Sequence, residues 1–196
     1  MNKIIARHYD KNVELFGNDF LALGWASIET QQVRFDTLTT IADLNNSHVL
    51  DVGCGLGDLC KYLNEYYEGI KYTGIDVSSE MISCARENHP GSKFLLRDLN
   101  DDDNEEYDYA FASGSFNIKV GDNYNYLDHS IERMWEGTSK GIAFNILSSY
   151  APEKMKDDFF FYYQPEKVFT LCSKYTQYII VRHDYLPNDV TYILKK

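Results

Sequence analysis

A run of glycines flanked by acids, at 51–58, is the part of this sequence whose residue types and spacing could hold a small ligand. Asp51 lies in a short apolar run typical of a buried strand, and Gly53, Gly55 and Gly57 follow at alternate positions, directly before a helical pattern. Glycine allows a sharp turn with positive φ and lets a ligand lie against bare backbone, so we expect the missing side chains to leave room for that ligand. The pattern predicts a strand, a tight turn and a helix N-terminus that together form a ligand site.

The charges around this turn indicate what the ligand carries. A dinucleotide site requires the spacing G-x-G-x-x-G/A, so that helix amides face a pyrophosphate. Here the third glycine comes one residue early, and Asp58 occupies the position of the last small residue. Carboxylates at Asp51 and Asp58 would repel a diphosphate in a partly dry pocket, whereas they suit a ligand with positive charge.

Asp51 and the three glycines match the pattern (D/E)-x-G-x-G-x-G, and the segment resembles motif I of the class I S-adenosylmethionine-dependent methyltransferases. The resemblance implies S-adenosyl-L-methionine as the cofactor and S-adenosyl-L-homocysteine as its product. This cofactor carries a sulfonium and an ammonium and has no phosphate, which agrees with the acidic turn. The alternative is an ordinary strand-to-helix turn, which explains one or two glycines but not an acid and three glycines in register.

A second acid follows the next predicted strand. Asp76 lies near the end of the apolar run 71–77 and 19 residues beyond Gly57. In doubly wound folds a carboxylate at a spacing of about 20 binds the ribose, and an ionised carboxylate can accept hydrogen bonds from two vicinal hydroxyls. The alternative role, capping of the next helix, is already supplied by Ser78 or Ser79. We therefore predict that Asp76 binds the ribose.

The remaining cofactor contacts are implied by the resemblance. Asp98 follows the third predicted strand, at the place of the motif III acid that accepts a bond from the adenine amino group, and the backbone beside it, at Leu99, meets the ring. Val77 and Met81 would sandwich the adenine, with core packing as the alternative. The complete set of expected cofactor-binding residues is Asp51, Gly53, Cys54, Gly55, Gly57, Asp76, Val77, Met81, Asp98, Leu99, Ser113 and Arg34.

Residues 1–47 precede the first core strand, and we expect them to form a helical extension that covers the cofactor cleft. Within this extension Val33, Leu38 and Ile41 recur at spacings that indicate an amphipathic helix. The resemblance suggests that Arg34, on this helix, pairs bidentately with the methionine carboxylate of the cofactor. The alternative is an ordinary surface arginine on an amphipathic helix.

The acceptor site is expected at the loops after the fourth and fifth strands, because loops at the carboxyl ends of strands flank the site in such folds. The loop 113–117 lacks the Asn-Pro-Pro-Tyr pattern used on exocyclic or amide nitrogens and the Pro-Cys pattern used on cytosine carbon, and the aromatic segment 148–164 is expected to cover the substrate. The expected catalytic residues are Asn117 and His183, and the expected substrate-binding residues are Trp25, Phe116, Asn117 and Tyr163. The alternatives are a polar turn without a catalytic role, a hydrogen-bonded hairpin cluster around His183, and core packing of the aromatic residues.

Seven strand-like runs, with helical patterns between them, set the expected fold. The runs lie at 49–52, 71–77, 93–96, 107–112, 141–147, 178–185 and 190–194. Their order predicts an α/β fold with a doubly wound, mostly parallel seven-stranded sheet that ends in an antiparallel hairpin. The length fits one such domain, 1–196, in which 1–47 is the extension and 48–196 the core.

Composition limits the expected partners. The net charge of -11, without a basic stripe, argues against nucleic acid, and no run approaches the length of a membrane span. The four cysteines form no C-x-x-C pair and the five histidines are scattered, so we expect a cytoplasmic protein with free thiols and no metal site. The expected partner is a small-molecule substrate, and the sequence gives no indication of the oligomeric state.

The sequence as a whole favours an S-adenosylmethionine-dependent methyltransferase that acts on an oxygen or nitrogen atom of a small molecule, such as a sugar, a sugar nucleotide or another metabolite. An acceptor alcohol would need a base such as His183, whereas an amine need only arrive deprotonated. Two other classes stay open. One is a non-catalytic domain of the same fold that binds the cofactor or a protein partner, and the other, with weaker support, is an NAD-dependent oxidoreductase.

Overall fold

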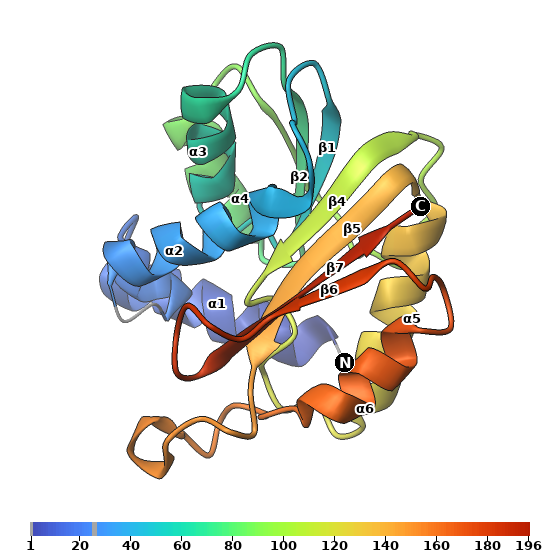
Figure 1. Ribbon diagram of the computed structural model, residues 1–196. Helices are drawn as coiled ribbons and strands as arrows, with labels where there is room; N and C mark the ends of the chain where they lie inside the picture. Colours follow the sequence, from blue (N-terminus) through green and yellow to red (C-terminus); the bar gives the residue numbers. More distant parts are fainter. Residues whose placement is uncertain (1, 25–26) are drawn as a thin grey trace.

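The structure of the protein is a computed structural model that describes residues 2–24 and 27–196. Its centre is a seven-stranded sheet with the strand order β3-β2-β1-β4-β5-β7-β6 (Figure 1). The strands are β1 (His48–Val52), β2 (Lys71–Asp76), β3 (Lys93–Leu96), β4 (Tyr107–Ser113), β5 (Thr138–Leu147), β6 (Ile179–Arg182) and β7 (Asp189–Lys195). The pairs from β3 across to β5 are parallel, and β7 runs antiparallel to β5 and β6. The predicted mostly parallel, doubly wound sheet with an antiparallel C-terminal hairpin is confirmed.

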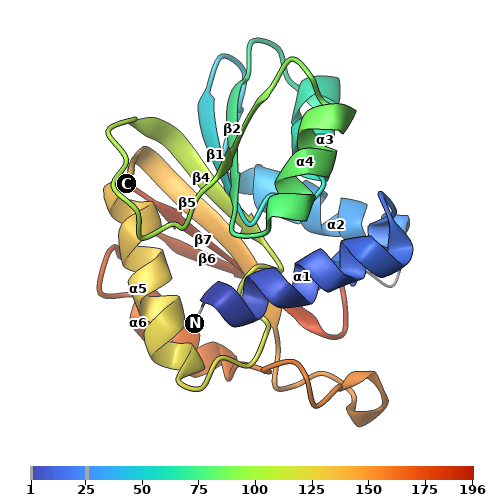
Figure 2. The same cartoon turned by 180° about the vertical axis from the view of Figure 1, so that it is seen from behind.

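Helices cover both faces of this sheet (Figures 1 and 2). They are α1 (Asn2–Phe16), η1 (Phe20–Leu23), α2 (Ile28–Leu38), η2 (Thr39–Ile41), α3 (Asp58–Tyr66), α4 (Ser79–Asn88), α5 (Asn123–Glu136), η3 (Glu153–Met155) and α6 (Pro165–Cys172). On one face α2, α3 and α4 bury Leu38, Leu63 and Ile82, and on the other face α5 and α6 bury Leu127 and Val168. The strands β1, β4, β5 and β7 therefore alternate their side chains between two apolar cores.

Local signals explain where two elements begin and end. α4 begins after Ser78, whose hydroxyl accepts a hydrogen bond from the Met81 amide at 3.1 Å, as the predicted N-cap requires. β6 ends at Arg182, so the expectation that this strand reaches residue 185 was wrong. The Arg182 side chain instead pairs with Asp184 at 2.7 Å, and the chain begins its turn there.

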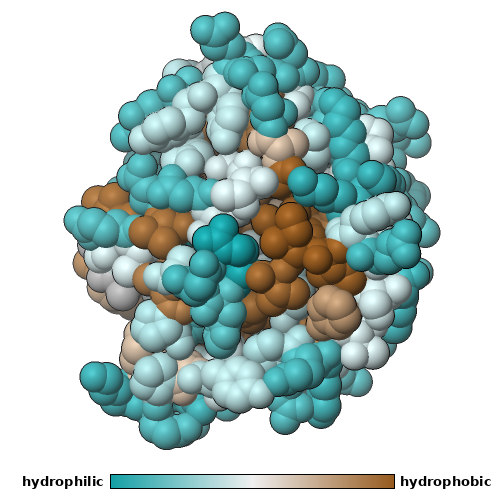
Figure 3. Space-filling view, viewed as in Figure 1, coloured by the Kyte–Doolittle hydropathy of each residue, from teal (hydrophilic) through white to brown (hydrophobic). Residues whose placement is uncertain are grey.

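The fold gathers the ends of several strands at one edge of the sheet. The carboxyl ends of the parallel strands β1, β2, β4 and β5 face the same side, and α1 crosses this side in Figure 2. Figure 3 shows a largely hydrophilic face with an apolar area over the β7–β6 side of the sheet, where Ile180 of β6 is 42% exposed. The loops after the parallel strands are therefore the part of the molecule that can form a shared site.

Candidate functional site

A cavity of about 340 Å³ lies at the carboxyl ends of β1, β2 and β4. Its volume is within the range of small-molecule sites, and its position is the one expected for a ligand in an open α/β sheet. Its lining includes the loops after these strands, the N-terminal helices, Tyr126 and Ser130 of α5, and a segment after β5 that includes Met155, Phe160 and Tyr162. One continuous, partly open cavity therefore connects the glycine-rich loop to the aromatic segment.

The glycine-rich loop has the backbone conformation that its sequence requires. Gly53, Gly55 and Gly57 have φ values of 72°, 52° and 87°, which side chains rarely adopt. A Cβ atom at these positions would meet Ser115, Leu23 and His89, respectively. The expectation that the missing side chains leave room for a ligand was therefore wrong, because the protein's own side chains pack into that space and the cavity lies beside the loop.

Asp51 is the acid at the start of this loop. It is 2% exposed, and its Oδ2 accepts a hydrogen bond of 2.6 Å from the Tyr72 hydroxyl on the neighbouring strand. Burial raises the pKa of Asp51 to about 7; the Tyr72 hydrogen bond opposes this shift, and the nearby carboxylates of Asp76 and Asp58 add to it. A cation beside Asp51 would favour its ionised form, so this residue is suited to a positively charged ligand.

Asp76 ends β2 and organises the backbone around the cavity. Its Oδ2 accepts a hydrogen bond from the Gly55 amide at 3.0 Å, and its Oδ1 accepts one from the Ser78 amide at 2.9 Å. Burial raises the pKa of Asp76, while these amide donors lower it. The Val77 amide also lowers the pKa of Asp76, so the carboxylate is held by backbone donors from both sides of the cavity, and its remaining lone pairs can accept from ligand hydroxyls.

The other predicted cofactor residues mostly gather around the same cavity. Cys54, Val77, Met81, Asp98, Leu99 and Ser113 line it together with Asp51, Gly53, Gly55 and Asp76. Gly57 is the exception: it is the N-cap of α3 and does not line the cavity. Asn145, buried within β5, fixes the loop after β4, since its side chain accepts a hydrogen bond from the Gly114 amide at 2.8 Å and donates one to Ser113 at 3.3 Å.

The N-terminal helices form one wall of the cavity. Ile5 and Tyr9 of α1 line it. Asp10 accepts a hydrogen bond of 2.6 Å from the Ser78 hydroxyl at the start of α4, and the His8 ring lies 4.4 Å from the ring of Phe159. α1 therefore contacts both the start of α4, next to β2, and the segment after β5. Trp25 lies outside the described residues.

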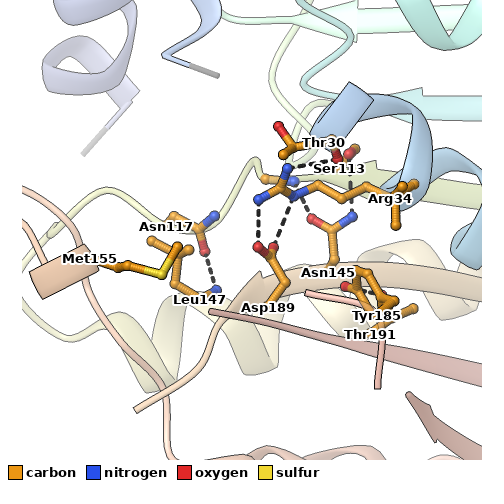
Figure 4. Close-up of polar contacts among 12 residues, drawn as sticks. Thr30, Arg34, Ser113, Asn117, Asn145, Leu147, Met155, Tyr185, Asp189 and Thr191 are labelled. Carbon is orange, nitrogen blue, oxygen red and sulfur yellow. Dashed lines mark hydrogen bonds and ion pairs between the residues drawn. The ribbon is translucent and has the colours of Figure 1, made fainter. Parts of the chain in front are cut away.

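Arg34 lines the cavity, but its guanidinium already holds a carboxylate of the protein. Its Nε and Nη2 donate to the two oxygens of Asp189, at 3.0 and 2.5 Å, and Nη1 donates to the Thr30 carbonyl at 2.8 Å (Figure 4). Asp189, the first residue of β7, therefore takes the bidentate position that we expected for the methionine carboxylate. The signal that sequence analysis missed is the acid at the start of the final strand.

Two of the predicted acceptor residues, Phe116 and Asn117, line the cavity. The Asn117 Oδ1 accepts a hydrogen bond from the Leu147 amide at 2.9 Å, and Figure 4 places Asn117 between Met155 and the Arg34–Asp189 pair. This bond leaves the Nδ2 group without a partner in the part of the chain that the structure describes. Asn117 can therefore donate a hydrogen bond to a ligand.

Tyr163 and His183 are not brought to the cavity. Tyr163 is fully buried, its hydroxyl donates to the Phe116 carbonyl at 2.8 Å, and its ring contacts Phe161, with centroids 4.7 Å apart. Because side chains alternate along an extended segment, Phe160 and Tyr162 face the cavity while Phe161 and Tyr163 face the core. His183 is exposed in the turn after β6 and does not line the cavity. The expected roles of these two residues are not supported by their positions.

Comparisons of the sequence point to one family. Residues 49–135 match the family model described as a methyltransferase domain. A protein of Mycobacterium tuberculosis whose name assigns it to the methyltransferases is 32% identical over 155 residues, which cover 74% of this chain and 91% of the relative. Trans-aconitate 2-methyltransferase of Delftia acidovorans is 42% identical over 82 residues, 42% of this chain and 30% of the relative. Phosphoethanolamine N-methyltransferase of Plasmodium falciparum is 35% identical over 88 residues, 44% of this chain and 30% of the relative.

Solved structures share the fold at lower sequence identity. Magnesium protoporphyrin IX methyltransferase from Synechocystis with bound S-adenosylhomocysteine matches with a TM-score of 0.73 and 13% identity, and the match covers both chains completely. Human N-acetylserotonin methyltransferase in complex with S-adenosylmethionine matches with a TM-score of 0.67 and 18% identity, over 97% of this chain and 57% of the other. The arrangement of strands and helices is thus the one that these proteins use.

Proposed function

The chain belongs to the class I S-adenosylmethionine-dependent methyltransferases, and on this premise we propose that it methylates an oxygen or nitrogen atom of a small molecule, such as a sugar, a sugar nucleotide or another metabolite. The names of two relatives, which specify trans-aconitate and phosphoethanolamine, support an acceptor of this size. The observation that carries the proposal is one continuous cavity, which extends from Asp51 and Asp76 to Met155 and Tyr162. It offers a cofactor and a small acceptor one shared space.

We assign the cofactor to the acidic half of this cavity. Asp51 would face the ammonium group and Asp76 the ribose hydroxyls, with Val77, Met81 and the Asp98–Leu99 backbone around the adenine. When bound, S-adenosylmethionine supplies an electrophilic methyl group. The protein holds the acceptor in line with that group and excludes water, and such positioning can contribute about 7–11 kcal/mol to lowering the barrier. Asn117 is placed to orient the acceptor through its amide donor.

The partners follow from charge and size. A net charge of -11 and a cavity lined by several aspartates support a small molecule as partner and disfavour nucleic acid. Among the described residues, no helix has both the length and the apolar character that a membrane crossing needs. We propose that residues 2–24 and 27–47 act as a cover of the same single domain, because Ile5, Tyr9 and Leu23 line the cavity.

A label-transfer experiment tests this function. The protein is incubated with S-adenosylmethionine that carries a deuterated methyl group and with a panel of sugars, sugar nucleotides, amines and alcohols. We expect the label in the small-molecule fraction, with S-adenosylhomocysteine formed in equal amount. Excess S-adenosylhomocysteine should block the transfer, whereas NAD should not. Parallel reactions contain protein or nucleic acid in place of the panel. Label found only in these reactions would contradict the small-molecule assignment, and binding of NAD alone would contradict the cofactor.

A further inference from the structure

We propose that the acceptor is an amine and not a carboxylic acid, and that Asp189 sets this preference by occupying Arg34. The inference rests on the proposed function and narrows it to one class of nucleophile. Three observations carry it: the charge of the cavity lining, the geometry of the Arg34–Asp189 pair, and the side chains of the segment after β5.

Acids outnumber bases in the cavity lining. The ionisable acids that line it are Asp51, Asp58, Asp76, Asp98 and Asp157. The bases that the described residues contribute are Arg34 and Arg97, and each is paired with an aspartate that lies behind it: Arg34 with Asp189 at 2.5 Å and Arg97 with Asp103 at 2.7 Å. Asp51, Asp76 and Asp98 are assigned to the cofactor, so the acid at the acceptor end is Asp157, and both arginines are already neutralised by aspartates. An anionic acceptor would therefore find little compensating charge, whereas a cationic one would be attracted to Asp157.

The Arg34–Asp189 pair blocks the group best suited to bind a carboxylate. An arginine holds a carboxylate through two parallel N–H donors, and Asp189 already accepts from both Nε and Nη2. The pair is nearly inaccessible to solvent, with 5% of Arg34 and 1% of Asp189 exposed. A carboxylate acceptor would have to displace a fixed, buried side chain from the next element, and we therefore expect it to bind poorly.

The segment after β5 supplies groups that bind amines. Phe160 and Tyr162 present aromatic rings to the cavity, and Asp157 adds a carboxylate at its more exposed end. The Tyr162 hydroxyl donates to the Met155 carbonyl at 3.1 Å and accepts from the Asp157 amide at 2.9 Å, so these residues hold one another in place. The face of an aromatic ring attracts an ammonium group, and the Lys156 ammonium already lies 5.9 Å from the centroid of the Tyr162 ring. The Phe160 ring and the Asp157 carboxylate are therefore the groups that we assign to the amine.

The transfer step balances without a further reactant. An ammonium acceptor first loses a proton to water at the open end of the cavity, which frees the nitrogen lone pair. The nitrogen then forms a bond to the methyl carbon while the bond from that carbon to sulfur breaks, and its electron pair stays on sulfur. The products are the methylated ammonium ion and the neutral thioether S-adenosylhomocysteine.

Matched ligand series test the preference directly. The protein is saturated with S-adenosylhomocysteine and titrated with an amine, an alcohol and a carboxylate of the same skeleton: phenethylamine, phenylethanol and phenylacetate; butylamine, butanol and butyrate; glucosamine, glucose and glucuronate. We expect the amine to bind at least about tenfold more tightly than the carboxylate in at least one series, with no series reversed. A tighter carboxylate in any series, or no preference for an amine in all three, would overturn the inference. Failure of S-adenosylhomocysteine itself to bind would instead count against the proposed function.

Substitution of Asp189 tests whether this residue acts by occupying Arg34 or only through the overall negative charge of the protein. In Asp189→Asn the Arg34 guanidinium loses its carboxylate, so we expect binding of carboxylates to strengthen at least about tenfold and the amine preference to fall. Asp184→Asn, in the same hairpin but outside the cavity, is the control and should change neither. If Asp189→Asn fails to fold, the double variant Arg34→Met with Asp189→Leu replaces it. This variant removes both charges and should keep the amine preference. Unchanged carboxylate binding in folded Asp189→Asn would refute the role of Asp189.

Discussion

At the scale of single residues, Asp51 links the ionisation of the site to ligand binding. Burial favours its neutral form and raises its pKa to about 7, and only the Tyr72 hydroxyl, at 2.6 Å, opposes this among the groups that shift it. A positively charged ligand group beside Asp51 is stabilised by the carboxylate but not by the carboxylic acid. Below this pKa, binding must first remove a proton, which costs about 1.4 kcal/mol per pH unit.

We therefore predict that the affinity for S-adenosylhomocysteine, which carries the ammonium group, falls as the pH decreases through about 7, by up to about tenfold per unit. Above this range it should be flat until the ammonium group of the ligand itself loses its proton. Calorimetric titrations across this range measure the effect. In Tyr72→Phe the donor that lowers the pKa of Asp51 is lost, so the same decline should begin at a higher pH. Asp51→Asn should abolish the decline, and a pH dependence that persists in this variant would refute the assignment.

At the scale of elements, the glycine-rich loop is held by close packing between β1 and α3. The Gly53 and Cys54 amides both donate to the Ile75 carbonyl, at 2.8 and 3.0 Å, and Gly57, the N-cap of α3, has a positive φ. The loop is therefore tied to β2 before any ligand binds.

Replacement of Gly57 tests this packing. In Gly57→Ala the alanine would have to adopt a strained φ of 87°, and its Cβ would meet the His89 and Phe94 side chains. We therefore expect the free energy of unfolding to fall by about 1–3 kcal/mol. Gly91→Ala is the matched control, because nothing lies within 4 Å of its Cβ position, and it should change stability by less than about 0.5 kcal/mol. Equal denaturation midpoints for the two variants would contradict this account.

The sequence predicts the elements well and the pairings between distant elements poorly. Asp51 and Asp76 follow apolar runs whose strands meet in parallel, so their convergence at one edge could be predicted from order alone. The Arg34–Asp189 pair joins residues that are distant along the chain, and neither local pattern reveals the partner. The sequence analysis expected the Tyr163 side chain at the cavity, but it faces the core. Side chains alternate between the two sides along this extended segment, and only its hydrogen bonds decide which of them face the core.

At the scale of the whole molecule, the cavity is closed by parts from both halves of the chain. α1 contacts the start of α4 through Asp10 and Ser78, and it contacts the segment after β5 through His8 and Phe159. These contacts are few, and α1 packs mainly against η1 and α4 rather than against the sheet. Local opening of α1 should therefore occur without unfolding of the core.

Hydrogen exchange tests this arrangement. A ligand that fills the cavity stabilises the closed state by mass action, so saturating S-adenosylhomocysteine should slow amide exchange in α1 and in the loop 53–57 by at least about tenfold. Exchange in α6, which does not line the cavity, serves as the internal control and should change much less. Equal slowing in α1 and α6 would indicate global stabilisation and would contradict a separately opening cover.

The central claim is that the cavity beside the glycine-rich loop binds S-adenosylmethionine through its acids, and Asp76 is the most direct probe of it. The decisive measurement is a calorimetric titration of S-adenosylhomocysteine into the wild type, Asp76→Ala and Asp102→Ala, an exposed acid outside the cavity. Loss of the carboxylate that orders the loop and accepts the ribose hydroxyls should weaken binding by at least about tenfold, since each charge-assisted hydrogen bond contributes about 1.5–3 kcal/mol. We predict one bound ligand in the wild type, unchanged binding in Asp102→Ala and this loss in Asp76→Ala. Equal affinity in the wild type and Asp76→Ala would contradict the claim.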